Sequence, residues 1–163
     1  MKFSTILAVV FLTSGCGVAA DKPAGHPDTG GEGWVEFFNK DLSNVKSKEG
    51  VWTRDGDGVL TASQDEAIWS EKKYGDFVLD LEFKTEDGTN SGVVVHCSDR
   101  ENWIPNSVEI QIADDFADKW AKADKTWQCG AIFGRLAATK SLVKKPGEWN
   151  RYTVTCQGKM IYV

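Results

Sequence analysis

The stretch of sequence that decides the fold class is Phe77-Val78-Leu79-Asp80-Leu81-Glu82-Phe83. Apolar residues occupy all of its odd-numbered positions, and the acidic residues Asp80 and Glu82 stand between them. Successive side chains of a β-strand point to opposite faces, so this period of two predicts a strand with one core-facing and one polar face.

Similar short strands are predicted on both sides of this stretch. A hairpin is expected at residues 51–62, where Asp-Gly turn chemistry separates two short runs. Only residues 114–125 have a pattern compatible with a helix. Many short strands separated by turns predict a β-sandwich or a barrel. We expect an all-β, two-sheet antiparallel sandwich; further strands are predicted at residues 93–97, 108–112, 131–133, 152–156 and 160–163, and the predicted core residues are Phe77, Leu79, Leu81, Val93, Val95, Ile110 and Ile112.

Residues 1–20 have the pattern of an export signal. Lys2 supplies a positive charge, residues 6–12 form a short apolar run, and Val18-Ala19-Ala20 fits a small-residue cleavage site. The run is too short to span a bilayer as a helix. Alternatively, Gly15-Cys16 belongs to a lipobox, and a lipidated Cys16 becomes the new N-terminus. Both alternatives predict an exported protein, in the periplasm or on the outer surface of a bacterium.

Residues 21–33 are rich in Gly, Pro and Asp, a composition that predicts a flexible linker. A single domain is expected from residue 34 to residue 163. The chain ends inside an expected strand, although the edges of a sandwich need to be closed. We therefore expect further strands beyond this C-terminus.

Charge and cysteine content limit the classes of partner. The formal net charge is −5 and the chain has no basic cluster, which argues against nucleic acid or an anionic membrane surface as partner. Membrane anchoring is expected only through a lipidated Cys16. The remaining cysteines, Cys97, Cys129 and Cys156, would form either one disulfide and one free thiol or three buried thiols.

Glu109 and Gln111 are candidates for a functional pair. Within residues 108–112 the period of two places the aliphatic side chains on the core face, and Glu109 and Gln111 side by side on the opposite face. A carboxylate and an amide at this spacing can bind adjacent sugar hydroxyls, and a carboxylate can act as a general acid or base. The alternative is that both side chains belong to a solvated outer face.

A second group of candidates lies around the neighbouring apolar run. Gly92 allows a close backbone approach, Asn90 and Ser91 supply hydrogen-bonding groups, and His96 is expected on the polar face. A lone histidine is otherwise an ordinary hydrogen-bonding residue. The chain also has seven tryptophans, whose flat rings suit stacking on sugars, with core packing as the alternative.

No metal or cofactor is expected. The domain has one histidine, which excludes a multi-histidine zinc site, and no two of its cysteines have metal-ligand spacing. Calcium is left open, because five aspartates lie in predicted turns, but turn chemistry explains them equally well. They are Asp55, Asp57, Asp87, Asp114 and Asp115.

From residue 34 to residue 163 the chain resembles a known family, and several motifs in a fixed order carry the resemblance. They are Gly33-Trp34, Phe37-Phe38-Asn39, Tyr74-Gly75-Asp76-Phe77, Glu82-Phe83-Lys84, Asn90-Ser91-Gly92, Glu109-Ile110-Gln111 and Gly147-Glu148-Trp149-Asn150. This set is similar to that of the 3-keto-disaccharide hydrolase domain. The resemblance implies a concanavalin A-like jelly roll. The chain departs from the family at Lys40, where members usually carry Gly.

The resemblance further implies a hydrolase that cleaves the glycosidic bond of 3-keto-glycosides or 3-keto-disaccharides, with a small carbohydrate or glycoside as its ligand. Glu109 and His96 are the expected catalytic residues. The alternative function is a non-catalytic, lectin-like carbohydrate-binding module, because the same fold serves both purposes. The expected substrate-binding residues are Asn90, Ser91, Gln111, Trp69, Trp149 and Asn150.

Overall fold

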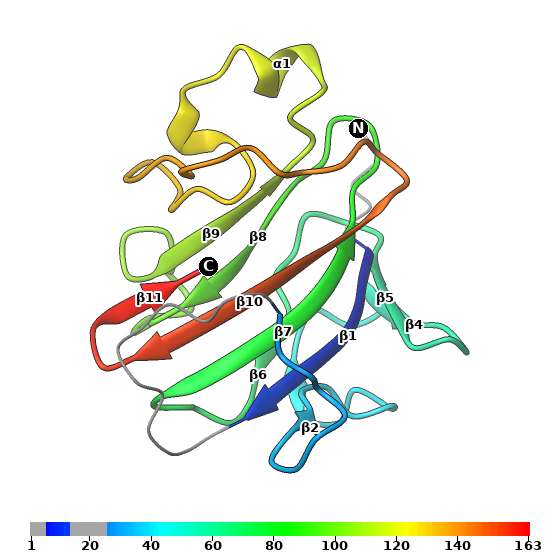
Figure 1. Ribbon diagram of the computed structural model, residues 1–163. Coiled ribbons are helices and arrows are strands. Elements are labelled where there is room, and N and C mark those ends of the chain that lie inside the picture. The colour runs from blue at the N-terminus through cyan, green and yellow to red at the C-terminus, as the bar shows by residue number, and fades with distance from the viewer. Residues whose placement is uncertain (1–5, 14–25) are drawn as a thin grey trace. The chain divides into compact units, whose positions relative to one another are not determined.

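The structure, a computed structural model, describes residues 6–13 and 26–163 and is nearly all β (Figure 1). The helix α1 (Asp118–Ala121) lies within residues 114–125, where the sequence pattern is compatible with a helix, and the short helix η1 (Lys125–Trp127) begins at the last residue of that range. The all-β class with antiparallel pairing, that of a β-sandwich, is confirmed. The strands are β1 (Ile6–Thr13), β2 (Val35–Glu36), β3 (Val45–Lys46), β4 (Trp52–Arg54), β5 (Val59–Ala62), β6 (Trp69–Ser70), β7 (Phe77–Lys84), β8 (Asn90–Val95), β9 (Val108–Ala113), β10 (Trp149–Gln157) and β11 (Met160–Tyr162).

The described residues form two compact units. The first unit is Lys84–Trp149, and the second unit combines Ile6–Phe83 with Asn150–Val163. The sequence predicted one domain over residues 34–163. The boundary between the units therefore falls inside that range, at the last residue of β7 and the first residue of β10.

The second unit contains the largest sheet. Its strand order is β11-β10-β7-β1-β5-β4, with β2 added to β1 (Figure 1). Strands β3 and β6 form a separate pair. The predicted hairpin is confirmed as β4 and β5, in which Trp52 pairs with Ala62. The Asp55 carboxylate closes its turn by accepting a hydrogen bond from the N–H of Val59 at 2.9 Å.

Strand β1 lies within the predicted export signal. Its backbone pairs antiparallel with β5 and with β2. Lys2, Cys16 and the expected cleavage site at Val18-Ala19-Ala20 lie outside the described residues, so the export signal stays a prediction. In the part of the chain that the structure describes, no helix is long and apolar enough to cross a membrane.

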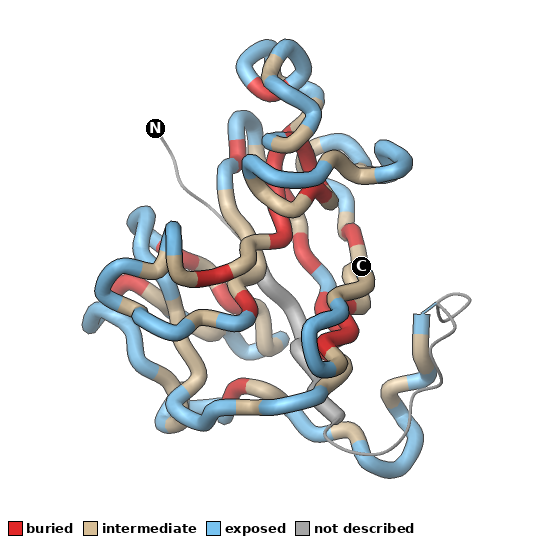
Figure 2. The backbone as a smooth tube through the Cα atoms, turned by 90° about the vertical axis from the view of Figure 1, so that its left-hand side faces the viewer, coloured by how far each residue is buried: buried red, intermediate tan, exposed pale blue. Residues whose placement is uncertain are grey.

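Strand β7 has the alternation that the sequence predicted. Leu79, Leu81 and Phe83 are buried and Glu82 is exposed, but Asp80, on the polar face, is only 4 % exposed. Figure 2 shows the exposed residues lying mainly in the turns. Among the predicted core residues, Leu79, Leu81, Val95, Ile110 and Ile112 are buried, whereas Phe77 and Val93 are half-buried.

Truncating Leu81 to Ala tests this core assignment. Leu81 is 1 % exposed, so the substitution should lower the free energy of unfolding by about 2–5 kcal/mol through lost burial and a cavity. Urea unfolding measures the change. The matched control is Leu142→Ala at a side chain that is 79 % exposed, where a change within about 0.5 kcal/mol is expected. Equal effects at the two positions would contradict the assignment of the core face.

Cys97, Cys129 and Cys156 are free thiols in the structure, and Cys16 lies outside the described residues. Cys129 and Cys156 are buried, and Cys97 is half-buried. Burial, with a smaller contribution from the charge of Asp76, raises the pKa of the Cys156 thiol to about 11, so this thiol stays protonated at neutral pH. The structure thus agrees with the alternative of three thiols, except that Cys97 retains some exposure.

Candidate functional site

The candidate site lies in the first unit, on one face of the hairpin formed by β8 and β9. Gly92 pairs with Gln111 in this hairpin, and Asn90 and Glu109 each lie two residues from that pair along their own strands. Directly paired residues of an antiparallel pair share a face, as do residues two apart on one strand. These four residues therefore share the face that the alternation of the sequence predicted for Glu109 and Gln111.

The side chain of Glu109 lies directly over Gly92. A Cβ atom placed on Gly92 would be 2.6 Å from Cγ of Glu109 and 2.9 Å from its Cδ, and closer still to Oε1. Only a residue without a side chain leaves room for the Glu109 carboxyl group in this position. Gly92 therefore leaves open the space that the carboxyl group occupies.

Gln111 is buried, contrary to the alternative of a solvated outer face. Its side chain is 1 % exposed, and its Nε2 donates to Oδ1 of Asn90 at 2.9 Å. Its backbone N–H donates to the carbonyl of Ala131 at 2.9 Å. Because Oδ1 of the exposed Asn90 accepts from Gln111, the Nδ2 protons of Asn90 are directed elsewhere. The pair thus presents hydrogen-bond donors at the surface beside Glu109.

A third backbone segment extends the hairpin beyond β9. The N–H of Phe133 donates to the carbonyl of Glu109 at 2.9 Å, and Ile132 forms an antiparallel bridge with Ile110. This register places Phe133 on the same face as Glu109. The ring centroid of Phe133 is 5.6 Å from that of Trp127, which is 45 % exposed. Neither ring was predicted as part of the site; the signal in the sequence was a Trp within a polar segment.

Two other candidates of the hairpin lie apart from this face. Ser91 pairs with Ile112, on the face opposite to Glu109. His96 follows the last residue of β8, has an exposed side chain, and adopts a φ of 52°. The alternation that predicted the face of His96 therefore ends one residue before it, and its catalytic role stays a prediction.

The remaining candidates lie in β6 and β10. Trp69 is half-buried in β6, in the second unit. The ring of Trp149, the first residue of β10, has the ammonium group of Lys84 at 5.0 Å from its centroid. Asn150 follows it on the opposite face of the strand and is 8 % exposed. Trp69 and Asn150 thus belong to the second unit, whereas Glu109 belongs to the first.

A buried ion pair in the second unit was also missed. Nε of Arg151 donates to both carboxylate oxygens of Asp80, at 3.1 and 2.9 Å, and its Nη2 lies 2.8 Å from Oδ2. The hydroxyl of Thr153 donates to the same carboxylate at 2.7 Å. The sequence signal was the spacing of Arg151 and Thr153, which puts both on one face of β10.

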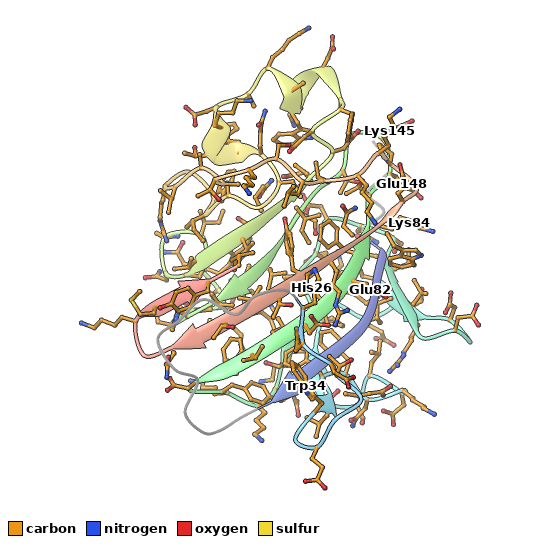
Figure 3. The ribbon with its side chains drawn as sticks, viewed as in Figure 1. His26, Trp34, Glu82, Lys84, Lys145 and Glu148 are labelled. Carbon is orange, nitrogen blue, oxygen red and sulfur yellow. The ribbon has the colours of Figure 1, made fainter. Side chains whose placement is uncertain are left out.

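This ion pair holds part of the predicted linker against the strands. Nη2 of Arg151 donates to the carbonyl of Pro27 at 2.9 Å. Nδ1 of His26, labelled in Figure 3, lies 2.8 Å from Oγ1 of Thr153. Since that hydroxyl has already donated its proton to Asp80, His26 is the donor in this contact. Residues 26 and 27 are therefore fastened to β7 and β10, while residues 21–25 of the linker lie outside the described residues.

Within residues 6–13 and 26–163, no three His, Cys, Asp or Glu side chains are arranged to hold a metal ion. Three of the aspartates considered for calcium, Asp55, Asp114 and Asp115, accept backbone hydrogen bonds. Asp114 accepts from the N–H of Gly88 at 2.8 Å, and Asp115 from that of Cys129 at 3.0 Å. Burial is the main reason that the pKa of Asp115 is raised.

Fold and site together define an all-β domain with a carboxylate and an amide pair on one face of a hairpin, beside the segment that carries Phe133. The chain belongs to the family of 3-keto-alpha-glucoside-1,2-lyase-like domains, which it matches over residues 33–163. The resemblance found in the sequence is therefore confirmed.

A similar solved structure is that of a protein from Parabacteroides distasonis that carries the provisional name glycosyl hydrolase. The two sequences are 52 % identical and the TM-score is 0.74, over 77 % of this chain and 64 % of that protein. The chain thus spans less than two thirds of the length of this relative. No curated protein matches the chain.

Proposed function

We propose that this domain cleaves the glycosidic bond of 3-keto-glycosides, with Glu109 as the group that moves the essential proton. The family and the similar structure support a carbohydrate-active, hydrolase-like role. The observation that carries the finer proposal is the Glu109 carboxyl group over Gly92, beside the Gln111–Asn90 pair.

The chemistry of a 3-keto sugar explains why one carboxylate suffices. The ketone at carbon 3 acidifies the hydrogen at carbon 2. A base removes this proton, the electron pair forms a double bond between carbons 1 and 2, and the bond from carbon 1 to the leaving oxygen breaks. The leaving oxygen takes up a proton, and water then adds across the double bond to give the free 3-keto sugar. This route does not need the paired carboxylates of an ordinary glycosidase.

The residues of the site fit distinct roles in this reaction. Glu109 is the base at carbon 2, and the Nδ2 group of Asn90 is the donor to the ketone oxygen, where negative charge develops. Gln111 positions Asn90 through the 2.9 Å hydrogen bond. His96 remains the sequence-based candidate for the acid at the leaving oxygen.

The proposal is tested by comparing a 3-keto-glucoside with the same glucoside that has not been oxidised. We expect the protein to release the leaving group from the keto substrate only. In D₂O, the keto sugar formed early in the reaction should carry deuterium at carbon 2, in excess of a control in which the product alone is incubated. Equal cleavage of the unoxidised glucoside would contradict the elimination route. Binding without turnover across several keto sugars would favour the lectin-like module.

Gly92→Ala should abolish most of this activity without unfolding the protein. The new Cβ would occupy the space of Cγ and Cδ of Glu109 and so displace the carboxyl group. Turnover of the keto substrate and thermal unfolding measure the two effects. Gly56→Ala is the matched control, because a Cβ there meets nothing within 4 Å. Full activity of Gly92→Ala would show that the observed position of Glu109 is not required.

We also propose that the protein is exported, with residues 1–20 removed or with the chain beginning at a lipidated Cys16. The pattern of Lys2, the apolar run and Val18-Ala19-Ala20 supports this proposal. The intact mass of the native protein from the bacterial envelope should correspond to one of these two forms. A mass that includes Met1 would contradict both.

A further inference from the structure

The N-terminal end of β9 carries a buried polar group that the fold does not use. Ser107 comes directly before β9 and is 8 % exposed, but its hydroxyl has no hydrogen-bond partner among the described residues. A buried hydroxyl without a partner lowers the stability of a protein. Such a group needs an explanation, and a ligand atom that completes the hydrogen bond is one.

Ser107 continues the alternation of β9. The carbonyls of Glu109 and Gln111 accept hydrogen bonds from residues 130–133, the segment along the free edge of the strand. The carbonyl of Ser107 accepts from Nη1 of Arg135, which follows that segment, at 2.8 Å. Carbonyls and side chains both alternate along a strand, so Ser107 shares the face of Glu109 and Gln111. Rotation about χ1 can turn its hydroxyl toward a ligand on this face.

Arg135 places a positive charge at the same point. Its side chain is exposed, and the hydrogen bond to Ser107 fixes one end of the guanidinium group at the edge of β9. Within residues 6–13 and 26–163 no carboxylate forms an ion pair with this cation. A guanidinium group has further N–H donors in a planar arrangement. These donors suit an oxygen atom that carries or develops negative charge.

The strand order relates this point to the groups of the proposed reaction. Gln111 and Ser107 lie on opposite sides of Glu109 along one face, each about 7 Å from it along the strand. In the sugar, carbon 2 lies between carbon 3 and carbon 1. With Glu109 at carbon 2 and the donor of Asn90 at the ketone on carbon 3, the oxygen on carbon 1 lies toward Ser107 and Arg135.

The geometry points to Arg135, with the hydroxyl of Ser107 beside it, as the group that stabilises the oxygen leaving carbon 1. When the bond from carbon 1 to this oxygen breaks, the electron pair of the bond stays on the oxygen. The guanidinium donates a hydrogen bond to it and keeps its own proton, until the acid of the proposed function protonates the oxygen. This inference rests on the proposed function, because Glu109 and Asn90 define how the sugar lies.

The test compares methyl 3-keto-glucoside with 4-nitrophenyl 3-keto-glucoside, whose leaving oxygen is stable as an anion without help. Arg135→Met should slow turnover of the methyl substrate roughly 10²-fold, the scale of one lost donor to a developing oxyanion, and leave that of the nitrophenyl substrate nearly unchanged. Arg135→Lys should restore part of the lost rate, because it restores the charge. Lys140→Met removes a charge from another exposed position of the first unit and should change neither rate. Equal slowing of both substrates by Arg135→Met would overturn the inference.

Hydrogen exchange at carbon 2 distinguishes a role at the leaving oxygen from a role at the ketone. In D₂O, uncleaved methyl substrate recovered from Arg135→Met should gain deuterium at carbon 2 faster than substrate kept without protein, since Glu109 and the ketone donor are intact. Loss of this exchange would place Arg135 at the ketone and overturn the inference. A wild-type protein that cleaves neither keto substrate would instead contradict the proposed function. Wild-type cleavage of both substrates, with equal slowing by Arg135→Met, would leave the proposed function standing.

The hydroxyl of Ser107 has its own test. Ser107→Ala should slow turnover of the methyl substrate roughly tenfold, the scale of one lost hydrogen bond, without lowering the midpoint of thermal unfolding, because it removes an unpaired buried hydroxyl. Thr85→Val is the matched control, since Thr85 also has a buried hydroxyl without a partner among the described residues, and it should leave the rate unchanged. A wild-type rate from Ser107→Ala would remove Ser107 from the position of the leaving oxygen.

Discussion

Replacing Glu109 with Gln should lower turnover of a 3-keto-glycoside by about 10²–10⁴-fold, the contribution of a positioned proton-transfer group. The two side chains have nearly the same shape, so the amide can occupy the space over Gly92 without repacking. What is lost is the charge and the capacity to accept the proton from carbon 2. Initial rates and thermal unfolding, measured on both proteins, separate the catalytic effect from a structural one.

Glu101→Gln is the matched control, because it makes the same chemical change at an exposed carboxylate of the first unit. We expect wild-type rates from it. Wild-type rates from Glu109→Gln would exclude Glu109 as the catalyst. In a protein that only binds sugar, Glu109→Gln would instead weaken affinity by roughly 1–3 kcal/mol, the scale of a lost charged hydrogen bond, with no turnover to lose.

The fold class could be predicted because alternation is a local signal. In β7 the sequence separates Leu79 and Leu81 from Glu82, and burial follows that separation. The apolar run at residues 6–12, which lies in β1, shows the limit of this signal. A short uninterrupted apolar run fits an export signal and a central strand equally well. Composition cannot distinguish the two, since the residues of the run show neither which strands it pairs with nor whether the segment is cleaved off.

The polar part of the candidate site was predictable, and its aromatic part was not. Glu109, Gln111 and Asn90 share a face because two strands alternate in register, and both alternations can be read from the sequence. Phe133 joins them only because its segment folds back along the free edge of β9. Gln111 is buried by the same returning segment, a contact between distant parts of the chain that alternation along one strand does not show. The face on which the side chain of His96 lies could not be predicted, because its positive φ ends the alternation of β8.

Asp80, in the second unit, is another residue whose surroundings the alternation did not predict. Its ion pair is expected to make a large contribution to the free energy of unfolding. Alternation placed Asp80 on the polar face, where a solvated carboxylate is the ordinary expectation. It is instead 4 % exposed, because Arg151 and Thr153 from β10 both donate to its carboxylate, and Arg151 also donates to the carbonyl of Pro27. A buried carboxylate is tolerated when its charge is paired and its oxygens are hydrogen-bonded.

Arg151→Met should therefore lower the free energy of unfolding by about 3 kcal/mol, the low end of the range for breaking a buried pair, because the Arg151 side chain is itself 32 % exposed. The substitution leaves the Asp80 carboxylate in place without its cation. Adding Asp80→Asn removes the buried charge as well, so the double variant should recover most of the loss, and urea unfolding of the four proteins completes a double-mutant cycle. Lys122→Met, at the Lys122–Asp118 pair whose side chains are 74 % and 90 % exposed, should cost less than about 1 kcal/mol. If Arg151→Met cost no more than Lys122→Met, or if the double variant were less stable than Arg151→Met alone, burial of an uncompensated charge would not be the cause.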